Sequence, residues 1–345
     1  IDAIGEAARR NVDVRLLFDS KFYEKNKATE DALSLMNGVH VRLIDIHAKT
    51  NGVMHAKYFV VDDEDTYIGS ANFDGRALDH IQEIGVRVRN PDVAHVIDQV
   101  FRNDWREAED LDPHRGVANS RERGAVEGFT RFGPKPLALP LPTLPIPIKL
   151  ADESEKVTPV ISPRRLMPEG YAVLDELPRL LDAIDHAKSS VDVQLLTYAV
   201  SGEDVTHKFT DLDDALKRAA ARGVHVRMLV SDWNLDNDKI ESLRELVRGS
   251  KVEIEIFTIP PFSQGFIPYA RVSHAKYMVV DGQVSWVGSS NWEESYFTST
   301  RNVGLLVEGK KFAGKLDTIF ETDWASKYAK AFDVNGTYTP RKRDQ

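Results

Sequence analysis

The chain has 345 residues, of which 42% are hydrophobic and 29% charged, with a formal net charge of −9 and no cysteine. This length and composition are typical of a globular protein with room for two domains, each with its own core. The sequence excludes disulfides, thiol catalysis and an apolar run long enough for a membrane span. Its net negative charge disfavours polyanion binding over the general surface and restricts any such binding to local basic clefts.

Short alternating elements in residues 1–112 predict a first α/β domain. In chain order we expect a helix at residues 1–10, strands at 12–18 and 39–46, a hairpin at 57–69, a strand at 84–88 and a helix at 93–105. Largely apolar, β-branched strands such as 12–18 are typical of a buried, mostly parallel sheet that is covered by helices.

Proline spacing marks the junction between two halves of the chain. Residues 113–156 are predicted to be a linker, because prolines alternate with leucine and isoleucine between residues 133 and 148. This spacing excludes helix and central strand and favours an extended, polyproline-like strap. The strap either packs over the two domains through its leucines or contacts a membrane or a protein partner.

A second α/β domain is predicted at residues 157–338, followed by a tail at 339–345. Its helix and strand ending at Val230 match the helix and strand ending at Phe18, at a constant offset (230 − 18 = 212). Residues 157–212 have no counterpart in the first domain. We therefore expect that a strand-helix-strand unit has been lost ahead of Ile1, and with it any signal or anchor. The strand at 12–18 should then have an uncovered edge. The sequence leaves the cellular location undetermined.

Two copies of one motif carry the candidate chemistry. The first copy comprises His55, Lys57, Asp62, Gly69, Ser70 and Asn72, and the second comprises His274, Lys276, Asp281, Gly288, Ser289 and Asn291. Equivalent residues keep the same offset throughout, as in 274 − 55 = 219 and 291 − 72 = 219. Six matches at one offset indicate an internal duplication. In each copy we expect a hairpin with the Gly-Ser-x-Asn loop at the end of its second strand.

The residue types of this motif suit phosphate chemistry. Histidine and lysine two residues apart on a strand point to the same face, so each copy places a nucleophile or proton carrier beside a cation. Two copies brought together would supply one imidazole to attack phosphorus and one to protonate the leaving oxygen, while lysine and asparagine hold the anionic oxygens. A metal site fits worse, because each lysine would repel the cation. We expect neither a metal nor a cofactor.

Both copies resemble the paired His-Lys-Asp motif of the phospholipase D superfamily, from Ile1 to about Trp324. Around the second copy, residues 267–272, Asn291-Trp292 and Tyr296-Phe297 resemble the branch that contains lysosomal exonucleases and poxvirus envelope proteins. The resemblance implies two similar α/β/α sandwich domains, related by a pseudo-twofold axis, with the active site at their interface. It also implies a two-step mechanism through a phosphohistidine.

The roles of the two histidines are predicted from one difference between the copies. Glu83 aligns with Asn302, and superfamily members commonly place an acidic residue here to bond the histidine Nδ1. A carboxylate fixes the ring tautomer and stabilises positive charge on the attacking imidazole. We therefore predict that Glu83 supports His55 as the nucleophile and that His274 is the general acid.

The remaining motif residues are assigned supporting roles. Asn72 and Asn291 are predicted to assist catalysis beside Lys57 and Lys276, whereas Ser70 and Ser289 are predicted to orient the substrate phosphate; ordinary loop capping is the alternative for these serines and asparagines. Structural roles in the hairpin are predicted for Asp62, Asp281, Gly69 and Gly288.

Three functions are compatible with the motif. The acidic surface and the aromatic loop at residues 259–269 favour a phosphodiesterase that hydrolyses or transfers the phosphatidyl groups of phospholipids. The branch resemblance, and stacking of unpaired bases on the same aromatic side chains, favour a nuclease for single-stranded nucleic acid. An inactive binding protein is disfavoured, since every motif position is filled. We expect a monomer that needs no protein partner, because one chain holds both half-sites.

Overall fold

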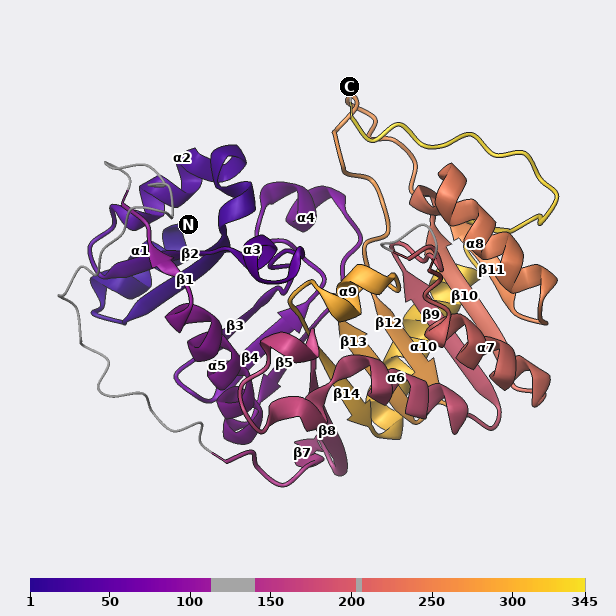
Figure 1. The fold of residues 1–345 in the computed structure, drawn as a ribbon, viewed down its shortest axis with the longest axis horizontal. Coiled ribbons are helices and arrows are strands. Elements are labelled where there is room, and N and C mark those ends of the chain that lie inside the picture. Colours follow the sequence, from indigo (N-terminus) through magenta and orange to yellow (C-terminus); the bar gives the residue numbers. More distant parts are fainter. Residues whose placement is uncertain (113–139, 203–206, 345) are drawn as a thin grey trace.

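The computed structural model describes residues 1–112, 140–202 and 207–344, which form two halves side by side (Figure 1). The predicted linker falls largely on residues 113–139, outside the described residues. The first half contains α1 (Asp2–Arg9), β1 (Val14–Asp19), η1 (Ser20–Phe22), α2 (Tyr23–Ser34), β2 (Val39–Ile44), α3 (Ile46–Thr50), β3 (Tyr58–Val61), β4 (Asp65–Gly69), α4 (Gly75–His80), β5 (Gly85–Arg89), α5 (Pro91–Arg106) and β6 (Glu109–Asp110).

The second half is built on one mixed sheet. Its elements are β7 (Ile146–Leu150), β8 (Glu153–Ser162), η2 (Arg164–Leu166), η3 (Tyr171–Leu174), α6 (Glu176–Asp185), β9 (Ser190–Leu195), α7 (Asp211–Ala221), β10 (His225–Ser231), η4 (Asp232–Leu235), α8 (Asn237–Arg248), β11 (Glu253–Phe257), β12 (Tyr277–Val280), β13 (Val284–Gly288), α9 (Glu294–Thr298), β14 (Asn302–Glu308), α10 (Lys310–Trp324) and β15 (Ala329–Ala331). The strand order is β15-β11-β10-β9-β12-β13-β14-β8-β7, with β9, β10 and β11 parallel.

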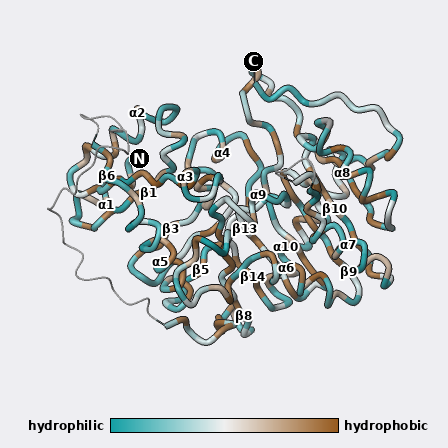
Figure 2. The backbone as a smooth tube through the Cα atoms, viewed as in Figure 1, coloured by the Kyte–Doolittle hydropathy of each residue, from teal (hydrophilic) through white to brown (hydrophobic). Residues whose placement is uncertain are grey.

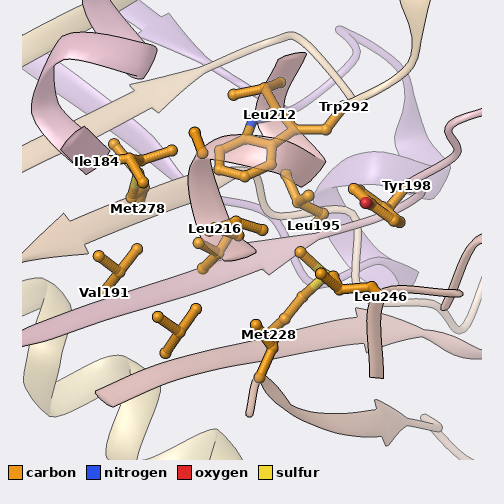
Figure 3. Close-up of a cluster of buried hydrophobic side chains, with 14 of the residues drawn as sticks. Ile184, Val191, Leu195, Tyr198, Leu212, Leu216, Met228, Leu246, Met278 and Trp292 are labelled. Carbon is orange, nitrogen blue, oxygen red and sulfur yellow. The ribbon is translucent and has the colours of Figure 1, made fainter. Parts of the chain in front are cut away.

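Helices cover both faces of this sheet, which confirms the predicted sandwich. Side chains of α6, α7 and α8 pack on one face, and Figure 3 shows Ile184, Leu212 and Leu216 meeting Met278 and Trp292 there. Side chains of α10 pack on the opposite face. In Figure 2 the hydrophobic stretches follow the sheets and the junction between the halves. At that junction α5 of the first half shares a core with β8 and β14 of the second. No helix among the described residues combines the length and apolar character needed to cross a bilayer.

The first half has a divided sheet. Its strands form two sheets of three, in the orders β1-β2-β6 and β3-β4-β5. In the second half β9 joins β10 to β12, whereas among the described strands none lies between β1 and β3. As predicted, β1 is therefore paired on one side only within the described part of the chain.

The divided sheet leaves apolar side chains uncovered. Phe59, Val61 and Phe73 are 47%, 47% and 64% exposed. Their equivalents in the second copy are Met278, Val280 and Trp292, which are at most 3% exposed because α6 and α7 pack on them. The same strand positions thus differ in exposure because only the second half has these covering helices among the described residues.

Residues 146–156, expected as part of an extended strap, belong instead to the edge of the nine-stranded sheet. β7 pairs with β8 antiparallel, and β8 continues across the predicted domain boundary at residue 157. The proline at position 147 is tolerated because β7 is an edge strand, where one side of the backbone needs no partner. The sequence pattern alone did not reveal this edge position.

Equivalent side chains of the two halves make crossed contacts at the junction. Arg301 forms a bidentate ion pair with Asp104, with Nε–Oδ2 and Nη2–Oδ1 distances of 2.8 Å. Their side chains are 0% and 3% exposed. At the equivalent positions of the opposite halves, Gln82 Nε2 donates to Asp323 Oδ2 at 2.7 Å. The repetition of this contact in both directions is what a pseudo-twofold axis between the halves requires.

Candidate active site

The two His-Lys pairs lie directly before β3 and β12, where each is held by the backbone of the opposite half. The His55 amide donates to the Arg301 carbonyl at 3.0 Å, and the His274 amide donates to the Gln82 carbonyl at 2.8 Å. These are equivalent contacts, since 274 − 55 and 301 − 82 both equal 219. The junction between the halves therefore fixes both motifs on the pseudo-twofold axis.

Each histidine ring is also held across this axis. His274 Nδ1 lies 3.0 and 2.9 Å from the two carboxylate oxygens of Glu83. His55 Nδ1 lies 3.1 Å from Asn302 Oδ1. The prediction that Glu83 supports His55 is therefore wrong. Glu83 and Asn302 were aligned correctly, but each one bonds the histidine of the other copy because the two halves exchange this contact.

The two motif serines hold these ring partners in place. Ser70 Oγ donates to Glu83 Oε2 at 2.5 Å, and Ser289 Oγ donates to Asn302 Oδ1 at 3.0 Å. Both serines are fully buried. They were predicted to orient the substrate phosphate, but their hydroxyls lie closest to Glu83 and Asn302, with the Ile84 and Val303 carbonyls as more distant acceptors at 3.2 and 3.4 Å. Each serine therefore orients the residue that orients the opposite histidine.

Both lysines are buried beside the histidines. Lys57 Nζ donates to the His55 carbonyl, and Lys276 Nζ donates to the His274 carbonyl at 2.6 Å. Lys57 is 7% exposed and Lys276 fully buried. Burial lowers the pKa of both ammonium groups, and repulsion from Lys276 lowers the pKa of Lys57 further. The carboxylate of Glu83 opposes this effect at both lysines.

The same burial and positive charge lower the pKa values of the two histidines. Burial lowers the pKa of His55 well below its usual range, and Lys57, Lys276 and His274 lower it further. Burial, Lys276 and Lys57 likewise lower the pKa of His274. Shifts in these directions are expected for four such side chains that share one desolvated space. A phosphodiester anion bound there would compensate for the repulsion among these groups.

The two asparagines differ in their surroundings. Asn291 is 1% exposed, with Nδ2 donating to Tyr296 Oη at 2.9 Å and Oδ1 accepting from the Thr197 amide at 3.4 Å. Asn72 is exposed. The structure thus fixes Asn291 within the site, while the equivalent Asn72 is not held in this way.

The residues predicted to be structural support the hairpins. Asp281 accepts from the amides of Lys188, Ser189 and Ser190 at 2.7 to 2.9 Å, tying the turn to the start of β9. Asp62 occupies the equivalent turn and is exposed. A Cβ at Gly69 would lie 2.6 Å from the Ile84 carbonyl oxygen, and one at Gly288 would lie 2.9 Å from the Trp286 ring. Close packing therefore requires glycine at both positions.

Tyr296 is a site residue to which the sequence assigned no role. Its ring centroid lies 5.1 Å from that of His55 with an interplanar angle of 86°. The equivalent position in the first half is Ala77, so internal repetition gave no signal. In the sequence, the Tyr-Phe pair contributes only to the resemblance around the second copy. Among the described residues no group of three or more His, Cys, Asp or Glu side chains is placed to hold a metal ion.

The crossed motifs define the site of a phospholipase D-like protein, and comparison places the chain in that superfamily. A family model described as "Cardiolipin synthase, PLD-like domain" matches residues 1–105 and 180–324. The chain therefore belongs to the phospholipase D superfamily, as its motifs predicted.

Among individual proteins, the chain is similar to 5'-3' exonuclease PLD3 of Homo sapiens, with 32% identity over 346 residues covering 95% of this chain and 66% of the relative. It is also similar to 5'-3' exonuclease PLD4 of Mus musculus, with 30% identity over 344 residues covering 94% of this chain and 65% of the relative. The chain thus spans slightly less than two thirds of the length of these relatives.

A solved structure with the same fold is phosphatidylserine synthase of Haemophilus influenzae Rd KW20. Its TM-score is 0.64 at 15% sequence identity, covering 96% of this chain and 78% of that chain. At this identity the likeness bears on the fold alone, and it agrees with the predicted pair of α/β/α halves.

Proposed function

We propose that this protein is a phosphodiesterase that cleaves single-stranded nucleic acid through a phosphohistidine intermediate. The observation that carries the proposal is the crossed support of the two histidines, in which Glu83 and Asn302 each hold the Nδ1 of the opposite ring. With Nδ1 of each ring engaged in this way, Nε2 is the nitrogen that we assign to the reaction, beside Lys57 and Lys276. This pairing suits a reaction that needs one nucleophile and one proton donor at a phosphate.

The support of each ring assigns the chemical roles. Glu83 accepts from His274 Nδ1, so this carboxylate can stabilise positive charge on the ring during attack. Asn302 cannot neutralise charge, but its Nδ2 donates to the carbonyls of Tyr296 and Thr300 at 2.9 and 3.0 Å. Its Oδ1 must therefore face His55 and accept from Nδ1. We assign His274 as the nucleophile and His55 as the general acid, which reverses the roles expected from the sequence.

The reaction then has two displacement steps. In the first, His274 Nε2 forms a bond to phosphorus while the phosphorus–oxygen bond to the leaving group breaks, and His55 Nε2 gives its proton to the leaving oxygen. In the second, neutral His55 takes a proton from water, the water oxygen bonds to phosphorus, and the phosphorus–nitrogen bond breaks. Lys57, Lys276 and Asn291 would hold the non-bridging oxygens throughout.

The choice of nucleic acid over lipid reverses the preference drawn from surface charge. Relatives that are 30 to 32% identical over 94 to 95% of this chain are named exonucleases, which supports this choice. The aromatic loop at residues 259–269 is compatible with it. Phe266 and Tyr269 are 45% and 41% exposed, and Lys25 Nζ of the first half lies 5.6 Å from the Tyr269 ring centroid. Aromatic faces beside cations suit unpaired bases and their phosphates.

A parallel assay on one preparation tests the substrate. With EDTA present, we expect release of nucleotides from a single-stranded oligonucleotide and little release of choline from phosphatidylcholine vesicles. The His274→Ala variant is the control for contaminating nuclease and should release neither product. Choline release without nucleotide release would overturn the proposal in favour of lipid. Oligonucleotide binding without turnover of either substrate would indicate a binding protein.

The pH dependence of kcat/KM tests the two protonation states. His274 must be neutral to attack and His55 protonated to donate, and burial beside the lysines lowers the pKa of both rings. The reactive form is most populated between the two pKa values, hence below the ordinary histidine value of about 6.5. We expect a bell-shaped profile centred on the acidic side of that value. Activity that keeps rising above pH 8 would contradict this expectation.

A further inference from the structure

Tyr296 joins three parts of the site. Its ring stands edge to face against His55, with centroids 5.1 Å apart. Its hydroxyl accepts from Asn291 Nδ2 at 2.9 Å, and its backbone carbonyl accepts from Asn302 Nδ2 at the same distance. Ser162 Oγ donates to that carbonyl at 2.8 Å, which ties α9 to the end of β8. Tyr296 therefore contacts the His55 ring directly and also holds the amide that accepts from that ring.

This arrangement exists on one side of the site only. The equivalent of Tyr296 is Ala77 in α4, since 296 − 219 = 77, so His274 has no matching aromatic neighbour from that position. His274 instead has the carboxylate of Glu83. Burial raises the pKa of Tyr296, so its hydroxyl stays protonated and neutral. The Tyr296 ring restricts the plane of the adjacent His55 ring. The two histidines thus have different supports, which matches the different tasks proposed for them.

We propose that Tyr296 is a positioning residue for His55, holding its ring in the plane from which the proton reaches the leaving oxygen. This inference rests on the function proposed above, in which His55 is the general acid. Without the Tyr296 ring beside it, the His55 ring could tilt away from the leaving oxygen while its Nδ1 stays near Asn302. Misplacement of a catalytic group by about 1 Å lowers the rate by about 10²-fold.

The test compares two leaving groups on the same nucleotide. The leaving group of a dinucleotide is an alkoxide, which is a poor leaving group unless a general acid protonates it. The leaving group of the p-nitrophenyl ester of thymidine 5'-phosphate is p-nitrophenolate, which needs little protonation. For Tyr296→Leu we expect a loss in kcat of about 10²-fold on the dinucleotide and of less than about 10-fold on the p-nitrophenyl ester. Tyr296→Phe keeps the ring and should keep the wild-type ratio of the two rates, even if the lost bond to Asn291 lowers both.

Phe297→Leu is the matched control. Phe297 lies next to Tyr296 on α9, is 5% exposed and stacks on Phe209 in the core, with ring centroids 5.8 Å apart. Its substitution should lower the melting temperature without changing the ratio of the two rates. If Tyr296→Leu does not fold, Tyr296→Met replaces it, because an unbranched side chain fills irregular space without a ring plane.

The outcomes separate this inference from the proposed function. Equal fold losses on both substrates in the leucine or methionine variant would overturn the positioning role and leave Tyr296 as a packing residue. A selective loss in Tyr296→Phe would also overturn it, because the ring is still present. A wild-type protein that cleaves neither substrate would instead overturn the proposed function.

Discussion

Replacing either of the two histidines to which we assign the reaction, His55 or His274, with alanine is expected to lower the turnover of a single-stranded oligonucleotide by at least about 10²–10⁴-fold, the range typical of proton-transfer catalysis. The loss should be larger for His274→Ala, because covalent attack is also removed. A substrate with a p-nitrophenolate leaving group distinguishes the two variants. His55→Ala should still release a first equivalent of p-nitrophenolate, since this group needs little protonation, whereas His274→Ala should release none.

Rapid-mixing absorbance measurements would resolve this first equivalent. His186→Ala is a suitable control, because the His186 side chain is 80% exposed and lies outside the site. It should retain wild-type rates on both substrates. A burst of p-nitrophenolate from His274→Ala, with none from His55→Ala, would reverse the assignment of nucleophile and acid.

Asp104→Ala is expected to reduce the free energy of unfolding by about 3–5 kcal/mol, the usual cost of leaving one member of a buried ion pair without its partner. Arg301 is 0% exposed and would retain contacts with the carbonyls of Ser162 and Leu166, which supply no full negative charge. Urea unfolding followed by tryptophan fluorescence would measure the change. Because the pair joins the two halves, loss of activity should accompany the loss of stability.

The pseudo-symmetric position supplies the control for this prediction. Gln82→Ala removes a hydrogen bond to Asp323, but Gln194 Nε2 still donates to the same carboxylate at 3.0 Å. The expected cost is about 1 kcal/mol, that of a typical hydrogen bond. Equal costs at the two positions would contradict the importance given to the buried charge of Arg301.

Local features of the site could be predicted from the sequence because their causes are local. The hairpins β3–β4 and β12–β13 follow from short apolar runs around polar turns, and Gly69 and Gly288 stand where neighbouring backbone or ring atoms leave no room for a side chain. The constant offset between the two motif copies predicted two equivalent halves. Both the superfamily and the sandwich fold could be inferred at this level.

Contacts across the pseudo-twofold axis could not be predicted in the same way. Aligning Glu83 with Asn302 identified equivalent positions, but equivalence within each copy does not say which copy receives the bond. The structure shows that the exchange occurs in both directions, at Glu83 with His274 and at Asn302 with His55. A role for Tyr296 was not predicted either. The equivalent residue of the first copy is Ala77, so the repeat did not mark this position as part of the site.

The position of residues 146–150 at the edge of the large sheet could not be predicted from the sequence pattern either. Prolines between residues 133 and 148 predicted an extended segment, and extension is what residues 146–150 show as β7. Whether an extended segment pairs with a sheet depends on a free edge elsewhere in the fold. β8 supplies that edge, and its own position follows from pairing with β14, a strand distant in the sequence, as in the register of Ser162 with Asn302.

Trapping the covalent intermediate would identify which histidine is the nucleophile. The His55→Ala variant is mixed with the p-nitrophenyl ester of thymidine 5'-phosphate and quenched, and mass spectrometry locates the bound nucleotidyl group. We expect an acid-labile adduct on His274 that accumulates, because the residue that activates water for the second step is absent. An adduct on His55 in the His274→Ala variant, with none on His274 in the His55→Ala variant, would contradict the crossed roles derived from Glu83 and Asn302.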